Sequence, residues 1–299
     1  MATRVWLDGA VTDAAGARVP VFDRGFLYGD SIFEATRTWG GVPLFLSEHL
    51  DRLQRSAASV ELTPPPRAEI EAATLATLAA ANQDPAQGES NLRIIVTRGE
   101  GEQGLDPALA GAPRLVVIVR EVALPAPELY LTGAKLAVVR RRKDAGRDHS
   151  VKSSNYLENL LALAEAKRDG AHEAVMLDGE GRVAEGATSN LFLVKAGRVV
   201  TPDVGVGLLP GITRAEVMDA ARGDGIVVEE SRPRPADLVA ADELFLTSSV
   251  RGVLPVTRLE AGGEHRIGDG RPGPVTRRLM ALYDARCVRD AAAFRARHG

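Results

Sequence analysis

The chain has 299 residues, of which 45% are hydrophobic and 26% are charged, a composition that allows one large or two medium globular domains. A formal net charge of -3 excludes the basic surface typical of nucleic-acid-binding proteins, and the single cysteine, Cys287, excludes an internal disulfide or a cysteine-based zinc site. Residues 1–9 lack the apolar core of a signal peptide and no apolar run could span a bilayer, so we expect a cytoplasmic protein with no membrane partner.

The first part of the chain alternates predicted strands with predicted helices. Apolar runs predict strands at residues 4–7, 19–22, 31–38, 42–46, 92–97 and 115–119. In the strand 31–38, Phe33 and Arg37 lie on one face because side chains alternate along a strand. Ser47 is expected to cap the next helix, and a second helix is expected at 67–82. A glycine-rich loop follows at 99–111.

Pro125 and Pro127 mark an expected linker at residues 121–130. It separates an N-terminal domain, residues 1–120, from a C-terminal domain, residues 131–299. In the second domain, apolar patterning and turn residues predict strands at 135–140, 174–177, 182–185, 190–194, 199–201 and 244–247. The basic run at 140–143, with Arg147 after it, is expected to be a solvated loop.

Three helices are expected in the second domain. The first has an apolar stripe of four residues, Leu157, Leu160, Leu161 and Ala164. The second begins near Thr213, which forms a T-x-x-E capping box with Glu216. The third covers residues 274–293.

Motifs of several common enzyme classes are missing. The chain has no GxxxxGK[ST] phosphate loop and no G-x-S-x-G nucleophile elbow. His172 and Glu173 begin as a zinc-binding HExxH motif would, but Met176 stands where the second histidine should be. We therefore expect no metal site and no serine hydrolase.

Lys152 is the first candidate for chemistry, because it lies just before a helix with an apolar start. A lysine at such a junction usually extends along the surface with its ammonium in water. Where it is partly buried instead, its amine becomes a nucleophile for an aldehyde.

Three further features fit the same chemistry. Glu185 ends an apolar strand, where it is either an edge-strand carboxylate or a group that keeps a pyridine nitrogen protonated, which makes the ring an electron sink. Residues 207–213 place a glycine-containing turn before a helix N-terminus, which is either the start of a plain capped helix or a site whose free N–H groups suit a phosphate. Arg52 can add a bidentate clamp, although a helix arginine more often faces solvent. These residues alone do not identify a cofactor.

Taken together, these segments resemble the class IV (fold type IV) pyridoxal-phosphate (PLP) enzymes over nearly the whole chain. The group holds branched-chain aminotransferases, D-amino-acid aminotransferases, (R)-amine transaminases and aminodeoxychorismate lyase. The resemblance implies an α/β (α+β) fold, with a two-layer α/β N-terminal domain and a C-terminal pseudo-barrel domain. It also implies a homodimer that holds pyridoxal 5'-phosphate between the two domains.

The resemblance implies roles for individual residues. Lys152 matches the lysine that forms the Schiff base and shuttles the proton, and Glu185 matches the carboxylate on the pyridine nitrogen. Tyr156 matches the tyrosine near the ring hydroxyl. The residues that match phosphate-binding positions are Arg52, Ile212, Thr213, Ser248 and Ser249.

Motifs that separate the subfamilies point in different directions. Tyr28, Arg93 and residues 155–157 are similar to branched-chain enzymes, but Asn91 replaces the tyrosine expected two residues before the arginine. The motifs at 185–190 and 247–249 are closer to D-amino-acid enzymes, whose Arg-x-His carboxylate trap is absent from residues 97–104. Residues 250–256 are similar to aminodeoxychorismate lyase.

We therefore predict an aminotransferase that passes an amino group from an amino acid to a 2-oxo acid, such as 2-oxoglutarate or pyruvate, by a ping-pong mechanism. The motifs slightly favour D-amino acids over branched-chain L-amino acids as donors. The candidates for substrate binding are Tyr28, Phe33, Arg37, Arg93 and Arg251, with Arg251 expected to anchor the carboxylate. The alternatives are a branched-chain or (R)-amine transaminase, aminodeoxychorismate lyase, and a binding protein that keeps the scaffold without the reaction.

Overall fold

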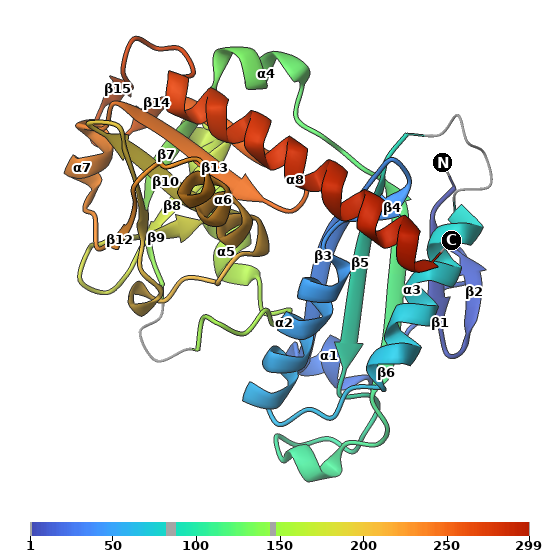
Figure 1. The fold of residues 1–299 in the computed structure, drawn as a ribbon. Coiled ribbons are helices and arrows are strands. Elements are labelled where there is room, and N and C mark those ends of the chain that lie inside the picture. The colour runs from blue at the N-terminus through green and yellow to red at the C-terminus, as the bar shows by residue number, and fades with distance from the viewer. Residues whose placement is uncertain (1, 82–87, 144–147, 299) are drawn as a thin grey trace. The chain divides into compact units, whose positions relative to one another are not determined.

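The computed structural model describes residues 2–81, 88–143 and 148–298, and the chain forms two compact units (Figure 1). The first unit comprises Met1–Ala123, Val151–Asn155 and Asp290–Gly299. The second comprises Leu124–Ser150 and Tyr156–Arg289. Lys152 therefore belongs to the first unit, although the chain before and after its short segment belongs to the second.

The first unit is a two-layer α/β structure whose six-stranded antiparallel sheet has the order β2-β1-β6-β5-β3-β4. The strands are β1 (Arg4–Leu7), β2 (Ala10–Asp13), β3 (Ser31–Trp39), β4 (Val42–Pro43), β5 (Ser90–Thr97) and β6 (Arg114–Glu121). Two long helices, α2 (Leu46–Ser59) and α3 (Arg67–Ala81), cover one face of the sheet and close a core on Ile32, Ile94 and Val117 (Figure 1). Because side chains alternate along a strand, Phe33, Arg37 and Arg93 lie on the opposite face. Two short helices, α1 (Arg24–Tyr28) and η1 (Pro107–Leu109), lie at the loops.

The second unit is a curled nine-stranded sheet with the order β12-β11-β10-β13-β14-β7-β8-β9, to which β15 adds beside β14. Its strands are β7 (Ala134–Arg142), β8 (Glu173–Leu177), β9 (Val183–Gly186), β10 (Asn190–Lys195), β11 (Arg198–Pro202), β12 (Val228–Ser231), β13 (Glu243–Ser248), β14 (Gly252–Glu260) and β15 (Glu264–Arg266). The last strand in the order, β9, also contacts β10, so the sheet curls into a pseudo-barrel. Both expected architectures, the two-layer domain and the pseudo-barrel, are confirmed.

Helices connect and cover the second sheet. Helix α5 (Leu157–Arg168) joins the parallel strands β7 and β8, and α6 (Ile212–Gly223) packs against β13 and β12. Shorter helices are α4 (Pro127–Thr132), η2 (Val204–Val206) and α7 (Pro235–Val239), and α8 (Pro274–His298) is the C-terminal helix. None of the helices in the described ranges is both long and apolar enough to cross a bilayer.

Three expectations for the first unit were wrong in whole or in part. Residues 19–22 form no strand, because Pro20 has no N–H to donate and the flanking Val19, Val21 and Phe22 are exposed; the hairpin partner of β1 is Ala10–Asp13 instead. Ser47 does not cap α2. The helix begins one residue earlier and its N-cap is Phe45 in a left-handed conformation (φ 49°), while the Ser47 hydroxyl accepts a hydrogen bond from Arg67. The strand expected at 42–46 is correspondingly reduced to Val42–Pro43.

The helix expected around the apolar stripe is α5, whose leucines are exposed and whose buried face consists of Ala162 and Ala166. Two expectations for the second unit were wrong. Thr213 and Glu216 form no capping box, because α6 begins at Ile212 with Gly211 as N-cap and Glu216 binds Arg286. The basic run is not a solvated loop: residues 140–142 end β7. Arg147 and Asn82, the expected end of α3, lie outside the described residues.

Candidate functional site

Lys152 is held beside the first sheet by its backbone. Its carbonyl oxygen accepts a hydrogen bond from the N–H of Phe33 at 2.9 Å, and its own N–H donates to the Ser56 hydroxyl at 3.3 Å. The next residue, Ser153, forms a β-bridge with Ile32. Lys152 thus sits on a short extended segment fixed along β3, rather than on a free surface loop.

The Lys152 side chain lies over an aromatic ring. Its Nζ is 4.4 Å from the centre of the Phe33 ring, and the Arg93 guanidinium is 4.0 Å from the same centre. Arg37, on the same strand face, lies over Trp39 instead. Three predicted residues, Lys152, Phe33 and Arg93, are therefore gathered on the sheet face opposite α2 and α3.

Arg52 is a residue of α2, and its side chain is buried with those of Glu34 on β3 and His49 on α2. Its Nε and Nη2 donate to the two carboxylate oxygens of Glu34, both at 2.7 Å, and His49 Nδ1 is 2.7 Å from Oε2. Burial alone would raise the pKa of Glu34, but the charge and hydrogen bonds of Arg52 and the hydrogen bond of His49 outweigh it and lower the pKa to about 2. Burial lowers the pKa of His49, which favours the neutral ring. The predicted phosphate ligand is thus held rigidly by a buried carboxylate.

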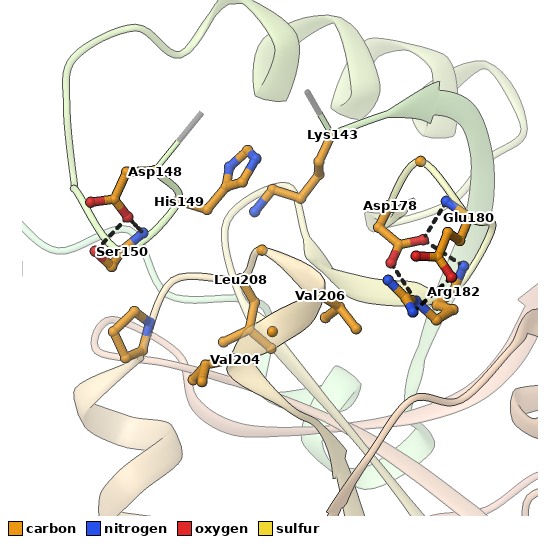
Figure 2. A pocket seen from close by; sticks show the side chains of 14 residues that line it. Lys143, Asp148, His149, Ser150, Asp178, Glu180, Arg182, Val204, Val206 and Leu208 are labelled. Carbon is orange, nitrogen blue, oxygen red and sulfur yellow. Dashed lines mark hydrogen bonds and ion pairs between the residues drawn. The ribbon is translucent and has the colours of Figure 1, made fainter. Parts of the chain in front are cut away.

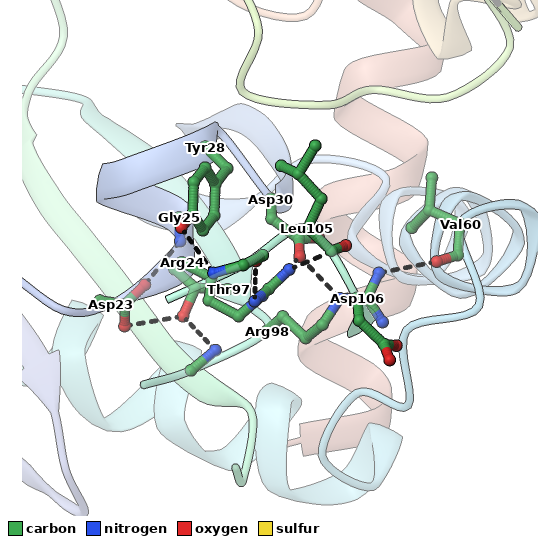
Figure 3. A network of polar contacts seen from close by, with 12 residues as sticks. Asp23, Arg24, Gly25, Tyr28, Asp30, Val60, Thr97, Arg98, Leu105 and Asp106 are labelled. Carbon is green, nitrogen blue, oxygen red and sulfur yellow. Dashed lines mark hydrogen bonds and ion pairs between the residues drawn. The ribbon is translucent and has the colours of Figure 1, made fainter. Parts of the chain in front are cut away.

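Tyr28 belongs to a polar network at the glycine-rich loop (Figure 3). Its hydroxyl accepts a hydrogen bond from the N–H of Gly104 at 3.2 Å, and Arg24, stacked over the Tyr28 ring at 5.1 Å, donates to the Gly104 carbonyl at 3.0 Å. Asp30 joins Arg24 and Arg98 through ion pairs of 3.1 and 2.8 Å. The network ties α1 and the loop together, so the position of Tyr28 depends on the loop.

Glu185 lies at the end of β9 with both carboxylate oxygens engaged. Oε1 binds the ammonium of Lys143, and Oε2 accepts from the N–H of Leu209 at 3.0 Å and from Asn190 Nδ2 at 3.2 Å. Both Glu185 and Lys143 are nearly buried. A buried carboxylate held by three donors is a fixed negative charge, not the solvated edge-strand group that was the alternative.

The turn before α6 is packed against the same network. Asn190 Nδ2 also donates to the carbonyl of Leu209 at 2.9 Å, and a Cβ on Gly211 would come within 2.0 Å of Asn190 Oδ1. No side chain caps α6, and the first N–H groups of a helix have no acceptor within the helix. The N–H groups at Ile212 and Thr213 can therefore bind an anion, on the same turn that binds Glu185.

The turn from β13 to β14 supplies hydroxyl groups. Ser248 Oγ accepts from the backbone N–H of Arg251 at 3.3 Å and from its Nε at 3.2 Å. Thr247 Oγ1 is buried and has no hydrogen-bond partner among the described residues. A buried hydroxyl without a partner is costly, which points to a polar ligand beside it.

Arg251, the expected carboxylate anchor, is bound within the protein. Its Nη2 donates to Glu173 Oε2 at 2.8 Å and to Thr188 Oγ1 at 2.7 Å. Contact of Arg251 with a substrate stays a prediction, as do the roles of Tyr156, the N-cap residue of α5, and Ser249.

A cavity of about 580 Å³ opens in the second unit beside Lys143 (Figure 2). Val204, Val206 and Leu208 line one side, and the ion-paired Asp178 and Arg182 line another. Its described lining does not include Glu185, Thr213 or Ser248, so it adjoins the Glu185 network through Lys143 without being the predicted cofactor site.

The second unit fits a phosphorylated pyridine. It offers a buried carboxylate for the ring nitrogen, uncapped helix N–H groups for a phosphate, and the unpartnered hydroxyl of Thr247. Among the described residues, no cluster of His, Cys, Asp and Glu side chains is arranged to hold a metal ion. Within this unit, the residues that would hold PLP are Glu185, Ile212, Thr213, Ser248 and Ser249.

Three residues of this network were missed from the sequence. Lys143 was assigned to a solvated run, Asn190 was quoted only as part of a motif, and Thr247 was passed over beside Ser248. A buried polar residue inside an otherwise apolar strand end is the signal that could have found Asn190 and Thr247. Nothing in the local pattern separates Lys143 from the arginines before it.

The chain is similar to known proteins over most of its length. The family model for amino-transferase class IV matches residues 31–259. The "Putative branched-chain-amino-acid aminotransferase" of Methanocaldococcus jannaschii is 38% identical, over 94% of this chain and 95% of that protein. The D-alanine aminotransferase of Bacillus licheniformis is 29% identical, over 97% of this chain and 99% of that protein.

Two solved structures are similar over most of their length. The T.th. branched-chain amino acid aminotransferase with pyridoxamine 5'-phosphate has a TM-score of 0.86 and 29% identity, over 95% of this chain and 93% of that one. The 4-amino-4-deoxychorismate lyase of Pseudomonas aeruginosa has a TM-score of 0.80 and 34% identity, over 93% of this chain and 97% of that one.

Proposed function

The chain belongs to the class IV aminotransferase family and is a PLP-dependent transaminase, and on this premise we propose that it transfers the amino group of a branched-chain L-amino acid to 2-oxoglutarate or a similar 2-oxo acid. The observation that carries this choice is Arg93, which lies over Phe33 at the position where the sequence is similar to branched-chain enzymes. The relative from Methanocaldococcus jannaschii, which is named a putative branched-chain-amino-acid aminotransferase, supports this choice of donor. The proposal reverses the order of donors that the sequence motifs alone favoured.

D-amino acids are the second candidate class of donor. The motifs around Glu185 and Ser248 favour them, and the D-alanine aminotransferase relative matches almost the whole chain. Aminodeoxychorismate lyase chemistry is a third candidate, which residues 250–256 and the likeness to the Pseudomonas lyase favour.

PLP supplies an aldehyde that binds amines and a ring that accepts electrons from the carbon being deprotonated. Lys152 would bind it covalently through Nζ, and its free amine would carry the proton of the substrate Cα. Glu185 would stabilise the positive charge at the ring nitrogen, and the hydrogen bonds of Asn190 and Leu209 hold the Glu185 carboxylate in place. Tyr156 would bind the ring hydroxyl.

The remaining residues are assigned to the cofactor phosphate and to the substrate. The phosphate is assigned to Arg52, to the N–H groups of Ile212 and Thr213, and to the hydroxyls of Ser248 and Ser249. The substrate is assigned to the face of the first sheet that carries Phe33, Arg37 and Arg93, with Tyr28 as a further contact. We also propose that the enzyme is a cytoplasmic homodimer.

A spectral half-reaction screen tests the donor class. The absorbance of the bound cofactor is followed after mixing with L-leucine, D-alanine, (R)-1-phenylethylamine and aminodeoxychorismate. The proposal predicts that L-leucine reacts fastest. D-alanine reacting fastest would favour the second candidate, and release of pyruvate from aminodeoxychorismate would favour the lyase. A purified protein that stays colourless with added PLP would leave only a binding protein on the same scaffold.

A further inference from the structure

We propose that Arg251 is a positioning residue for the phosphate subsite, and that it acts through the hydroxyl of Ser248. The inference rests on the proposed function, because it assigns Ser248 to the PLP phosphate. It differs from a role in binding the substrate carboxylate, which needs the guanidinium itself to face the substrate.

The anchor of Arg251 is Glu173, the first residue of β8, which is 1% exposed. Glu173 Oε2 accepts from Arg251 Nη2 at 2.8 Å and from Thr188 Oγ1 at 2.5 Å, and Oε1 accepts from the N–H of Ala174 at 3.1 Å. Thr188 Oγ1 accepts in turn from Arg251 Nη2 at 2.7 Å. A buried carboxylate with this many donors has one preferred geometry, so it fixes the guanidinium that pairs with it.

The other side of the guanidinium sets the direction of one hydroxyl. Arg251 Nε and the Arg251 backbone N–H both donate to Ser248 Oγ, at 3.2 and 3.3 Å. A serine hydroxyl has two acceptor lone pairs and one proton to donate. With both lone pairs occupied by Arg251, Ser248 is left to act as a donor, which is what a phosphate oxygen requires.

Backbone contacts hold the same turn. The carbonyl of Arg251 accepts from the Tyr130 hydroxyl at 2.9 Å. A Cβ on Gly186 would come within 2.3 Å of Ser189 Oγ, so the loop that carries Thr188 is closely packed as well. Arg251 therefore joins three segments of the second unit: the start of β8, the loop after β9 and the turn after β13. Lysine at this position can reach Glu173 or Ser248 but lacks the fork that binds both.

The test measures cofactor affinity rather than turnover. Apoenzyme forms of wild type, R251K, S248A and R251K/S248A are titrated with PLP and with pyridoxal, which has no phosphate. R278K, at a surface arginine paired with Asp224, is the matched control. We expect R251K to bind PLP roughly ten- to hundredfold more weakly, as for a lost hydrogen bond to a charged group, and to bind pyridoxal as wild type does. R251K added to S248A should cause no further loss, because the two residues act as one unit.

Each other result overturns the inference. It fails if R251K leaves PLP affinity unchanged, weakens PLP and pyridoxal alike, or adds its full effect to that of S248A. Unchanged PLP affinity with slower amino-acid donors, but not slower 1-phenylethylamine, would make Arg251 the carboxylate anchor instead. If R251K does not fold, E173Q/R251M, which removes both charges together, takes its place. Wild type that fails to bind PLP would refute the proposed function itself, which is a different outcome from any of these.

Discussion

In the proposed site Glu185 is assigned to the ring nitrogen, where a negative charge is needed when electrons enter the ring. Glu185→Gln keeps the shape and the hydrogen-bonding side chain but removes the charge. We expect turnover to fall on the order of a hundredfold or more, while the cofactor stays bound. Steady-state rates and the retained cofactor absorbance measure the two effects. Glu180→Gln, on an exposed partner of Arg182, is the control and should leave turnover near wild type. Near-normal turnover of the Glu185 variant would mean that another group holds the ring nitrogen.

Glu34 makes the free energy of unfolding depend on pH. Its pKa is lowered to about 2 in the folded protein from an ordinary value of 4.5, so its contribution is fully present above pH 4.5 and is lost as the pH falls towards 2. The lowered pKa of His49 acts in the same direction, because the unfolded chain takes up the proton more readily.

Glu34→Gln breaks the buried pair with Arg52, and we expect it to cost about 3–5 kcal/mol of unfolding free energy at pH 7. The cost should shrink as the pH approaches 2, where wild type has lost the same interaction. Denaturant unfolding of the apoenzyme across this range measures it. Asp51→Asn, which breaks the exposed pair with Arg67, should cost about 1 kcal/mol or less. Equal costs for both variants would contradict the picture of a buried, rigid Arg52.

Among the elements, α6 depends most on a single glycine. Gly211 has ordinary backbone angles (φ -70°, ψ 138°), so alanine is excluded there only by the Asn190 oxygen at 2.0 Å from the added carbon. Gly211→Ala should push Asn190 away from Glu185 and Leu209, which lowers the melting temperature and weakens PLP binding. Gly223→Ala, in the last turn of the same helix with nothing within 4 Å, should be neutral or slightly stabilising. If Gly211→Ala behaves like Gly223→Ala, the turn is not the tight support inferred here.

The sequence predicts elements well where the pattern itself decides the structure. The strand around Ile32 follows from alternation, the strands around Ile94 and Val117 follow from apolar runs, and the motif from Lys152 to Thr213 resembles the family. Prediction from the sequence fails where tertiary packing decides which side chains are buried or paired. Nothing local tells that α5 buries its small alanines rather than its leucines, or that Lys143 leaves the basic run to bind Glu185. The Arg52–Glu34 and Arg251–Glu173 pairs join residues far apart in the chain, so only the fold reveals them.

At the scale of the whole molecule, the exposed leucines of α5 support the proposed homodimer. Leu157, Leu160 and Leu161 are 66%, 63% and 36% exposed and lie on one side of the helix. Exposing an apolar face of this kind to water is unfavourable, and such a face is typical of a protein–protein interface. Leu160→Glu should therefore shift the protein towards monomer in sedimentation velocity. Leu131→Glu, at a leucine on α4 that is 75% exposed, is the control and should leave the assembly unchanged. A Leu160 variant that sediments as wild type would remove α5 from the interface.

We propose that Lys152 carries the cofactor, and borohydride reduction followed by peptide mapping identifies the lysine that does so. Reduction makes the bond between lysine and PLP permanent, so the modified peptide identifies the residue. We predict that the label lies on Lys152, in the segment fixed beside Phe33. Label on Lys143, the buried lysine that binds Glu185, or on Lys135, Lys167 or Lys195 would contradict it.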